Sequence, residues 1–145
     1  MLKVKDVFTT ITSDFPTVSP TADFEEIFTS FKNMNPLFRS LFVVEDDSML
    51  KGIIPVSKVI KGFSLKKGIR THHSYSVKSL FQLTSSHMTA EDLMIKCPVI
   101  YVNDSLEEAL QFMVEKNVDE LPVVDENKKI AGHLNIFELL QNFDH

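Results

Sequence analysis

The sequence has no aspartate or glutamate from Ser48 through Ala90, although the whole chain carries 20 acidic residues and a formal net charge of −5. Because this stretch is rich in basic residues, it can form a face that attracts anions even on an acidic protein. A solvated surface of lysines that binds nothing is the alternative interpretation. The basic residues of this stretch are Lys51, Lys58, Lys61, Lys66, Lys67, Arg70 and Lys78.

Cysteine, tryptophan and long apolar runs are also scarce. The chain has one cysteine and no tryptophan, which excludes an internal disulfide framework and fits a reducing compartment. No apolar run approaches the ~20 residues that a membrane-spanning helix needs. Lys3, Lys5 and Asp6 stand where a secretory signal would be apolar. We therefore expect a cytoplasmic protein without a membrane segment.

Groups that could perform catalysis or bind a metal are not arranged for either task. No histidine accompanies Cys97 as the base that a cysteine nucleophile needs, and His72, His73 and His87 lack the spacing of metal ligands. Neither a Walker phosphate loop nor a dinucleotide glycine fingerprint is present. His133 is expected to be a surface or packing histidine. We expect a protein that is not an enzyme and holds no metal.

An internal repeat organises most of the chain. Placing Pro16 on Pro98 aligns PTVSPTADFEEIF with PVIYVNDSLEEAL, and Glu25 and Glu26 then fall on a second pair of glutamates. After a two-residue insertion in the first copy, LFVV aligns with LPVV and Gly52 aligns with Gly132. Two segments of roughly fifty residues therefore share one plan.

Each copy predicts a strand, an amphipathic helix, two strands and a closing helix, in the order β-α-β-β-α. Asp104 with Glu107 predicts a capping box at the start of the helix in the second copy. The first copy has Ala22 at the position of Asp104, so its cap is expected to be weaker or to move to Thr21.

The predicted fold class is α/β, with two β-α-β-β-α motifs related by a pseudo-twofold axis and packed through their sheets. The first motif, with a short N-terminal lead, is assigned to residues 1–62. A basic connecting segment with a short helix is assigned to residues 63–88, and the second motif to residues 89–145.

The repeat resembles the tandem cystathionine β-synthase (CBS) domain pair, or Bateman module, of the stand-alone prokaryotic type. The leads VKDVF and AEDLM, the segment DSLEEALQFM and the segment ELPVVDENKKIAGHLNIFELL carry the resemblance. It implies a regulatory module that binds an adenosine-containing ligand in clefts between the halves and acts on a partner protein. It also implies a homodimer and no resident cofactor, with AMP, ADP, ATP or S-adenosylmethionine as the effector.

The strongest motif of this family is glycine, two residues, Ser or Thr, two residues and Asp, and the second copy has Gly132, Asn135 and Glu138 at these positions. The resemblance implies that Asn135 meets a phosphate and that Glu138 accepts hydrogen bonds from ribose hydroxyls. A plain capping box, worth ~1 kcal/mol without a ligand, explains the same two residues. The two interpretations are compatible.

The first copy departs from that motif, because Pro55 supplies no hydroxyl and Lys58 cannot accept a hydrogen bond from ribose. The resemblance also implies, through the pseudo-twofold axis, that Arg39 reaches a ligand held by Asn135 and Glu138 and that Glu120 faces the cleft of Lys58. We therefore predict one competent cleft and one impaired cleft.

The resemblance also implies an adenine pocket lined by the residues that enter the first strand of each copy. In the competent cleft these residues are Cys97, Pro98 and Val99, and in the weaker cleft they are Phe15, Pro16 and Thr17.

Two other functions remain open on the sequence. A nucleic-acid-binding protein would use the basic 51–78 span, with weak binding that falls as salt rises. A dimerisation scaffold whose clefts have lost their ligand would also fit Pro55, Lys58 and the acids Asp119 and Glu120.

Overall fold

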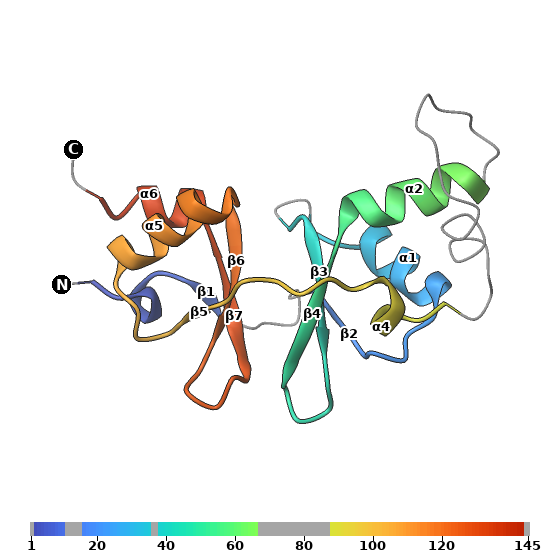
Figure 1. Cartoon of the computed structure of the whole chain (residues 1–145), viewed down its shortest axis with the longest axis horizontal. Coiled ribbons are helices and arrows are strands. Elements are labelled where there is room, and N and C mark those ends of the chain that lie inside the picture. Colours follow the sequence, from blue (N-terminus) through green and yellow to red (C-terminus); the bar gives the residue numbers. More distant parts are fainter. Residues whose placement is uncertain (1, 11–15, 36–37, 67–87, 144–145) are drawn as a thin grey trace. The chain divides into compact units, whose positions relative to one another are not determined.

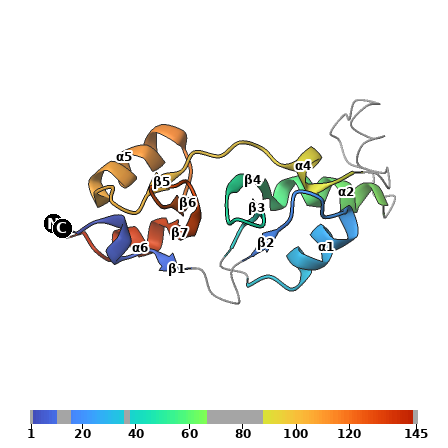
Figure 2. The same cartoon turned by 90° about the horizontal axis from the view of Figure 1, so that it is seen from below.

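The computed structural model describes residues 2–10, 16–35, 38–66 and 88–143, and the chain divides into two compact units (Figures 1 and 2). Unit 1 contains Met1–Phe15, Asp46–Leu50 and Lys96–His145. Unit 2 contains Pro16–Glu45 and Lys51–Ile95. Each unit combines one mixed sheet with helices, so the predicted α/β class and the repeated β-α-β-β-α order are confirmed.

Unit 2 is built on a three-stranded sheet in the order β2-β3-β4, with β2 parallel to β3. Helices α1 and α2 lie together on one side of this sheet (Figure 1). The elements of this half are β2 (Thr17–Val18), α1 (Phe24–Lys32), β3 (Ser40–Val44), β4 (Leu50–Pro55), α2 (Val56–Lys66) and α4 (Ala90–Leu93).

Unit 1 repeats this plan with one added edge strand, so its sheet has the order β1-β7-β6-β5. Strands β5 and β6 are parallel, whereas β7 runs antiparallel to both β6 and β1. The elements are the 3-10 helix η1 (Val4–Asp6), β1 (Thr9–Thr10), β5 (Ile100–Tyr101), α5 (Leu106–Lys116), β6 (Glu120–Val124), β7 (Ile130–Asn135) and α6 (Ile136–Leu140).

Each unit has its own hydrophobic core between the sheet and its helices. The apolar residues of α1 and α5 recur every three or four positions, which puts them on one helix face. The alternate residues of the central strands meet that face. In unit 2 the core includes Phe24, Ile27, Leu41, Val43 and Ile54, and in unit 1 it includes Leu106, Ala109, Met113, Leu121, Val123, Leu134 and Leu139.

The helix caps differ from the predicted ones. Ser105, not Asp104, is the N-cap of α5 and forms a capping box with Glu108. The Asp104 carboxylate instead accepts a hydrogen bond from the Tyr101 backbone N–H at 2.9 Å, which closes the preceding turn. In α1 the cap is Asp23, whose side chain accepts from the backbone N–H three residues later at 2.8 Å. The predicted weak cap of the first copy was therefore wrong.

The two short leads pack with the opposite copies of the repeat. In η1, the Val4 N–H donates to the Asp104 carbonyl at 2.9 Å, and Val4 is fully buried. In α4, the Ala90 N–H donates to the Ala22 carbonyl at 2.8 Å, and Ala90 is equally buried. The ranges 1–62 and 89–145 follow the sequence repeat, whereas the contacts group each lead with the other copy.

Helix α2 continues to Lys66, so it extends into the predicted connecting segment 63–88. Residues 67–87 of that segment, with Lys67, Arg70 and Lys78 of the basic stretch, lie outside the described residues, so the short helix expected there stays a prediction.

Gly52 lies where the segment after α4 runs against β4. Ile53 and Ile95 exchange two backbone hydrogen bonds, of 3.0 and 2.8 Å. A Cβ atom on Gly52 would lie 2.7 Å from the Ile95 carbonyl oxygen and 3.0 Å from the Met94 sulfur. We expect Gly52→Ala to separate this pair and to lower the free energy of unfolding by ~1–3 kcal/mol in urea denaturation.

The neighbouring variant Lys51→Ala is the control for that experiment, because Lys51 is exposed and its 3.4 Å ion pair with Glu45 lies at the surface. Its expected loss is below ~1 kcal/mol. Equal stability of Gly52→Ala and the unsubstituted chain would contradict the close approach.

Candidate functional site

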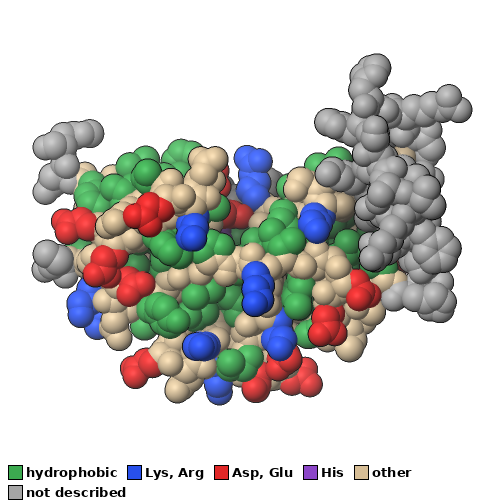
Figure 3. All heavy atoms as spheres, viewed as in Figure 1, with side chains coloured by type: hydrophobic (Ala, Val, Ile, Leu, Met, Phe, Trp, Pro, Cys, Tyr) green, Lys and Arg blue, Asp and Glu red, His purple; other side chains and the backbone are tan. Residues whose placement is uncertain are grey.

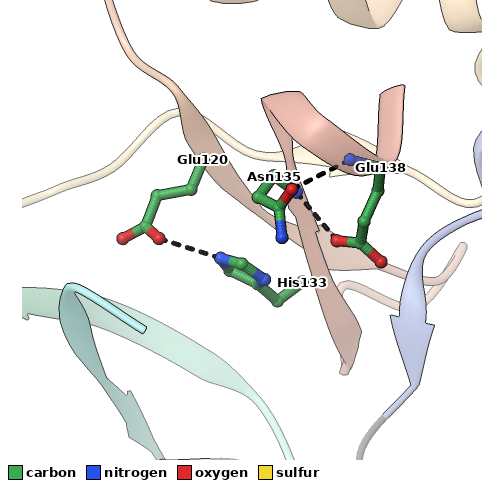
Figure 4. Close-up of polar contacts among 4 residues, drawn as sticks. All are labelled: Glu120, His133, Asn135 and Glu138. Atoms are coloured by element: carbon green, nitrogen blue, oxygen red, sulfur yellow. Dashed lines mark hydrogen bonds and ion pairs between the residues drawn. The ribbon is translucent and has the colours of Figure 1, made fainter. Parts of the chain in front are cut away.

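The junction between β7 and α6 in unit 1 brings Asn135 and Glu138 together. Asn135 ends the strand and is the N-cap of the helix, and its Oδ1 accepts from the Glu138 backbone N–H at 2.9 Å. Glu138 Oε1 in turn accepts from the Asn135 N–H at 3.0 Å (Figure 4). The capping box predicted from the sequence is confirmed. It also fixes the Glu138 carboxylate in a half-buried position.

A second polar contact lies beside this cap. His133 Nε2 and Glu120 Oε2 are 3.0 Å apart, and Figure 4 shows the two side chains pointing toward each other. The His133 side chain is 2% exposed and the Glu120 side chain is 15% exposed. Of the two predictions for His133, a surface or a packing histidine, the buried side chain fits the packing residue. Glu120 is the partner of one ring nitrogen, which offsets part of the cost of burying that nitrogen.

Strand pairing places these two contacts next to each other. Glu120 and Asn135 are direct partners in the antiparallel pairing of β6 with β7, and His133 is two residues before Asn135 on the same strand face. We call Glu120, His133, Asn135 and Glu138 the polar cluster. Sequence reasoning missed His133 as a member, although its spacing of two from Asn135 was a usable signal.

The corresponding junction of unit 2 lacks these polar groups. Pro55 ends β4 directly before α2, and Lys58 lies exposed in the first turn of the helix. The backbone is conserved within the repeat, because the Val56 N–H donates to the Arg39 carbonyl at 3.0 Å just as the Ile136 N–H donates to the Asp119 carbonyl at 2.8 Å.

The other predicted ligand contacts lie near the starts of the first strands. Cys97, Pro98 and Val99 are half-buried and directly precede β5, and Gly132 pairs with Val123 inside the sheet. In unit 2, Pro16 is buried and Thr17 is exposed, while Phe15 lies outside the described residues. Whether these residues contact a ligand stays a prediction, as do the expected reach of Arg39 and the orientation of Glu120 toward Lys58.

The Cys97 thiol is expected to be unreactive in the folded protein. Desolvation by burial raises the pKa of Cys97 from 9.0 to about 11, against an opposing backbone hydrogen bond. The thiolate is the nucleophile, so at about pH 8 a disulfide reagent should modify the folded chain roughly a hundredfold more slowly than the urea-unfolded chain. Equal rates would contradict the burial.

The same pKa shift predicts how stability depends on pH. The folded state holds the Cys97 proton more tightly than the unfolded state, so the free energy of unfolding should fall as pH rises from about 9 toward 11. The variant Cys97→Ser should lack this part of the pH dependence.

Within the described ranges, no group of three His, Cys, Asp or Glu side chains is arranged to hold a metal ion. His72, His73 and His87 lie outside those ranges. None of the helices that the structure describes has the length and apolar character required to cross a bilayer.

Comparisons with known proteins identify the repeat. The model of the CBS domain family matches residues 4–64 and 90–145. The crystal structure of a CBS domain-containing protein from Thermotoga maritima is 30% identical, with a TM-score of 0.67 and coverage of 96% of this chain and 92% of that one. The structure of CBSX2 in complex with AMP is 21% identical, with a TM-score of 0.72 and coverage of 96% and 93%.

A curated relative, an uncharacterized protein from Methanopyrus kandleri, is 35% identical in an alignment of 77 residues that covers 51% of this chain. The matched part covers 39% of the length of that relative. The family model and the Thermotoga maritima structure confirm the resemblance found in the repeat, and the chain belongs to the CBS domain family, with two CBS domains in tandem.

Proposed function

We propose that the chain is a non-enzymatic regulatory module that binds an adenosine-containing ligand, either an adenosine nucleotide or S-adenosylmethionine. The observation that carries the proposal is the Asn135–Glu138 capping box in a chain of the CBS family. The cap holds a carboxylate at the helical offset where it can accept hydrogen bonds from ribose hydroxyls. The AMP held by CBSX2 supports an adenosine compound as the ligand class.

The proposed contacts divide into a competent and an impaired set. Asn135, Glu138 and Gly132 form the competent set, with Arg39 and the run Cys97, Pro98 and Val99. The impaired set predicted from the sequence contains Phe15, Pro16, Thr17, Pro55, Lys58 and Glu120. Because Pro55 and Lys58 have no acceptor for ribose, we expect one ligand per chain.

The proposed mechanism is a shift between two conformations of the module. A ligand that binds one conformation more tightly populates that conformation, and a partner protein then meets a different surface. The lone thiol of Cys97 fits a reducing compartment, and we propose that the module acts in the cytoplasm.

A thermal-shift panel tests this function on the purified full chain. The panel compares AMP, ADP, ATP and S-adenosylmethionine with short duplex DNA and RNA at low and high salt. A ligand at a hundred times its dissociation constant adds ~2.7 kcal/mol, which should raise the melting temperature by roughly 5 to 10 °C. We expect such a rise with at least one adenosine compound at both salt concentrations.

Two other outcomes would replace the proposal. A rise only with nucleic acid, lost at high salt, would favour a nucleic-acid-binding protein that uses the basic 51–78 span. No rise with any compound would favour a scaffold whose ligand sites are no longer used.

We also propose that the module is a homodimer that associates through α5 and α6. Val114, Phe137 and Leu140 are 72%, 71% and 53% exposed, and Figure 3 shows hydrophobic side chains along the surface of this helix pair. Water-exposed apolar side chains of this size favour a protein contact. We expect sedimentation to give a dimer, and the double variant Phe137→Glu and Leu140→Glu to give a monomer.

The control for that variant is Leu2→Glu, because Leu2 is 45% exposed but lies outside the two helices. It should remain a dimer. A monomeric unsubstituted chain, or a dimer that survives the double substitution, would exclude this interface.

A further inference from the structure

Glu120 lies closer to the proposed ligand position than the sequence indicated. It is the direct cross-strand partner of Asn135. Side chains paired in this way on one face of an antiparallel sheet have Cβ atoms about 5 Å apart. A ligand group that contacts the Asn135 amide therefore also lies near the Glu120 carboxylate.

His133 keeps that carboxylate in place. A free glutamate side chain turns away from an unfavourable neighbour, because its rotamers interconvert at small cost. Here the Glu120 carboxylate is bound at 3.0 Å to an imidazole that is 2% exposed, so turning away would break a part-buried hydrogen bond. Glu120 should therefore face the ligand as a fixed charge.

Glu138 adds a second fixed carboxylate, because the cap binds it to the Asn135 backbone N–H. The polar cluster thus presents two held carboxylates on either side of Asn135, as Figure 4 shows. A phosphate at this position would meet like charges, whereas hydroxyl groups or a cationic centre would meet acceptors. Arg39, the one guanidinium proposed for the site, would offset only one of the two carboxylates.

We propose that Glu120, positioned by His133, is a specificity-determining residue of the ligand site. It selects adenosine compounds that carry a neutral or cationic group beside the ribose over compounds that carry phosphates. This inference rests on the proposed function and narrows its ligand class. The assignment gives Glu120 a role in the competent set rather than in the impaired one.

Titration calorimetry with adenosine, S-adenosylmethionine, AMP and ATP tests the proposal on the full chain. The unsubstituted protein should bind adenosine or S-adenosylmethionine more tightly than AMP and ATP. Glu120→Gln keeps an oxygen that can accept from His133 but removes the charge. It should raise the affinity for ATP relative to adenosine by about tenfold, which corresponds to ~1.4 kcal/mol.

Glu126→Gln is the matched control, because it removes the same charge from the exposed turn between β6 and β7. It should change the ratio of ATP to adenosine affinity less than about twofold, since exposed charges far from the ligand are screened. Tighter binding of AMP or ATP than of adenosine by the unsubstituted protein would overturn the inference but leave the proposed function standing. An ATP-to-adenosine ratio that Glu120→Gln leaves unchanged would do the same. Failure of all four compounds to bind would overturn both.

The ranking by the unsubstituted protein needs no variant, so the inference stays testable if Glu120→Gln destabilises the fold. A ranking with AMP or ATP first would then be sufficient to reject it.

Discussion

Replacement of Glu138 by alanine should weaken binding of the adenosine ligand by about ten- to a hundredfold. A hydrogen bond to a charged group contributes ~1.5–3 kcal/mol, and the variant removes the carboxylate proposed to accept from the ribose hydroxyls. Titration calorimetry with the ligand found in the thermal-shift panel measures the loss. Unchanged affinity would remove Glu138 from the site.

The second capping box of unit 1 provides the control. Ser105 and Glu108 cap α5 through the same pair of hydrogen bonds that Asn135 and Glu138 make at α6. Glu108→Ala should therefore cost a similar ~1 kcal/mol of stability and leave ligand affinity unchanged. This comparison separates loss of a cap from loss of a ligand contact.

Substitution of Val4 by aspartate should have the largest effect on stability, a loss of ~3–5 kcal/mol. Val4 is fully buried in the unit 1 core, and its backbone N–H donates to the Asp104 carbonyl. The new carboxylate would be buried without a charged partner or would pull η1 away from the core. Urea denaturation measures the loss in free energy of unfolding.

Leu2→Asp makes the same chemical change at a site that is 45% exposed, and its loss should stay below ~0.5 kcal/mol. Hydrogen exchange adds a local test, because the Val4 variant should lose protection first at the β1–β7 pairing that follows η1. A loss at Val4 no larger than at Leu2 would contradict the packing of the lead with the second copy.

The fold class was predictable because the repeat shows the same hydrophobic pattern twice. Burial of one face requires apolar residues at every second position of a strand and at every third or fourth position of a helix, as at Leu106, Ala109 and Met113. These patterns involve neighbouring residues only, so the sequence alone shows them. The capping box of Asn135 and Glu138 was predictable for the same reason, since cap and acid are three residues apart.

The misplaced caps show where local patterns are ambiguous. Asp104 and Ser105 are both good N-cap residues, and each is followed three positions later by a glutamate. The bond from Asp104 to the Tyr101 N–H and the contact of its carbonyl with Val4 distinguish them. These partners lie in the preceding turn and in the distant N-terminal segment, so the pattern of residues around the helix start does not predict them.

To predict the polar cluster, one needs to know the register between β6 and β7 as well as the sequence. A shift of one residue between β6 and β7 would place Glu120 opposite a different residue and remove it from Asn135. The packing of each lead with the opposite copy could not be predicted either, because each lead directly precedes its own copy in the sequence.

The most direct test of the account is an NMR titration of the labelled full chain with the adenosine compound that gives the largest thermal shift. The account predicts that the backbone N–H signals of Asn135 and Glu138 shift in a saturable way, because both groups bind the side chains proposed to hold the ligand. The signals of Ser105 and Glu108, in the equivalent cap of α5, should remain in place. Saturable shifts that leave the β7–α6 junction unchanged would contradict the central claim.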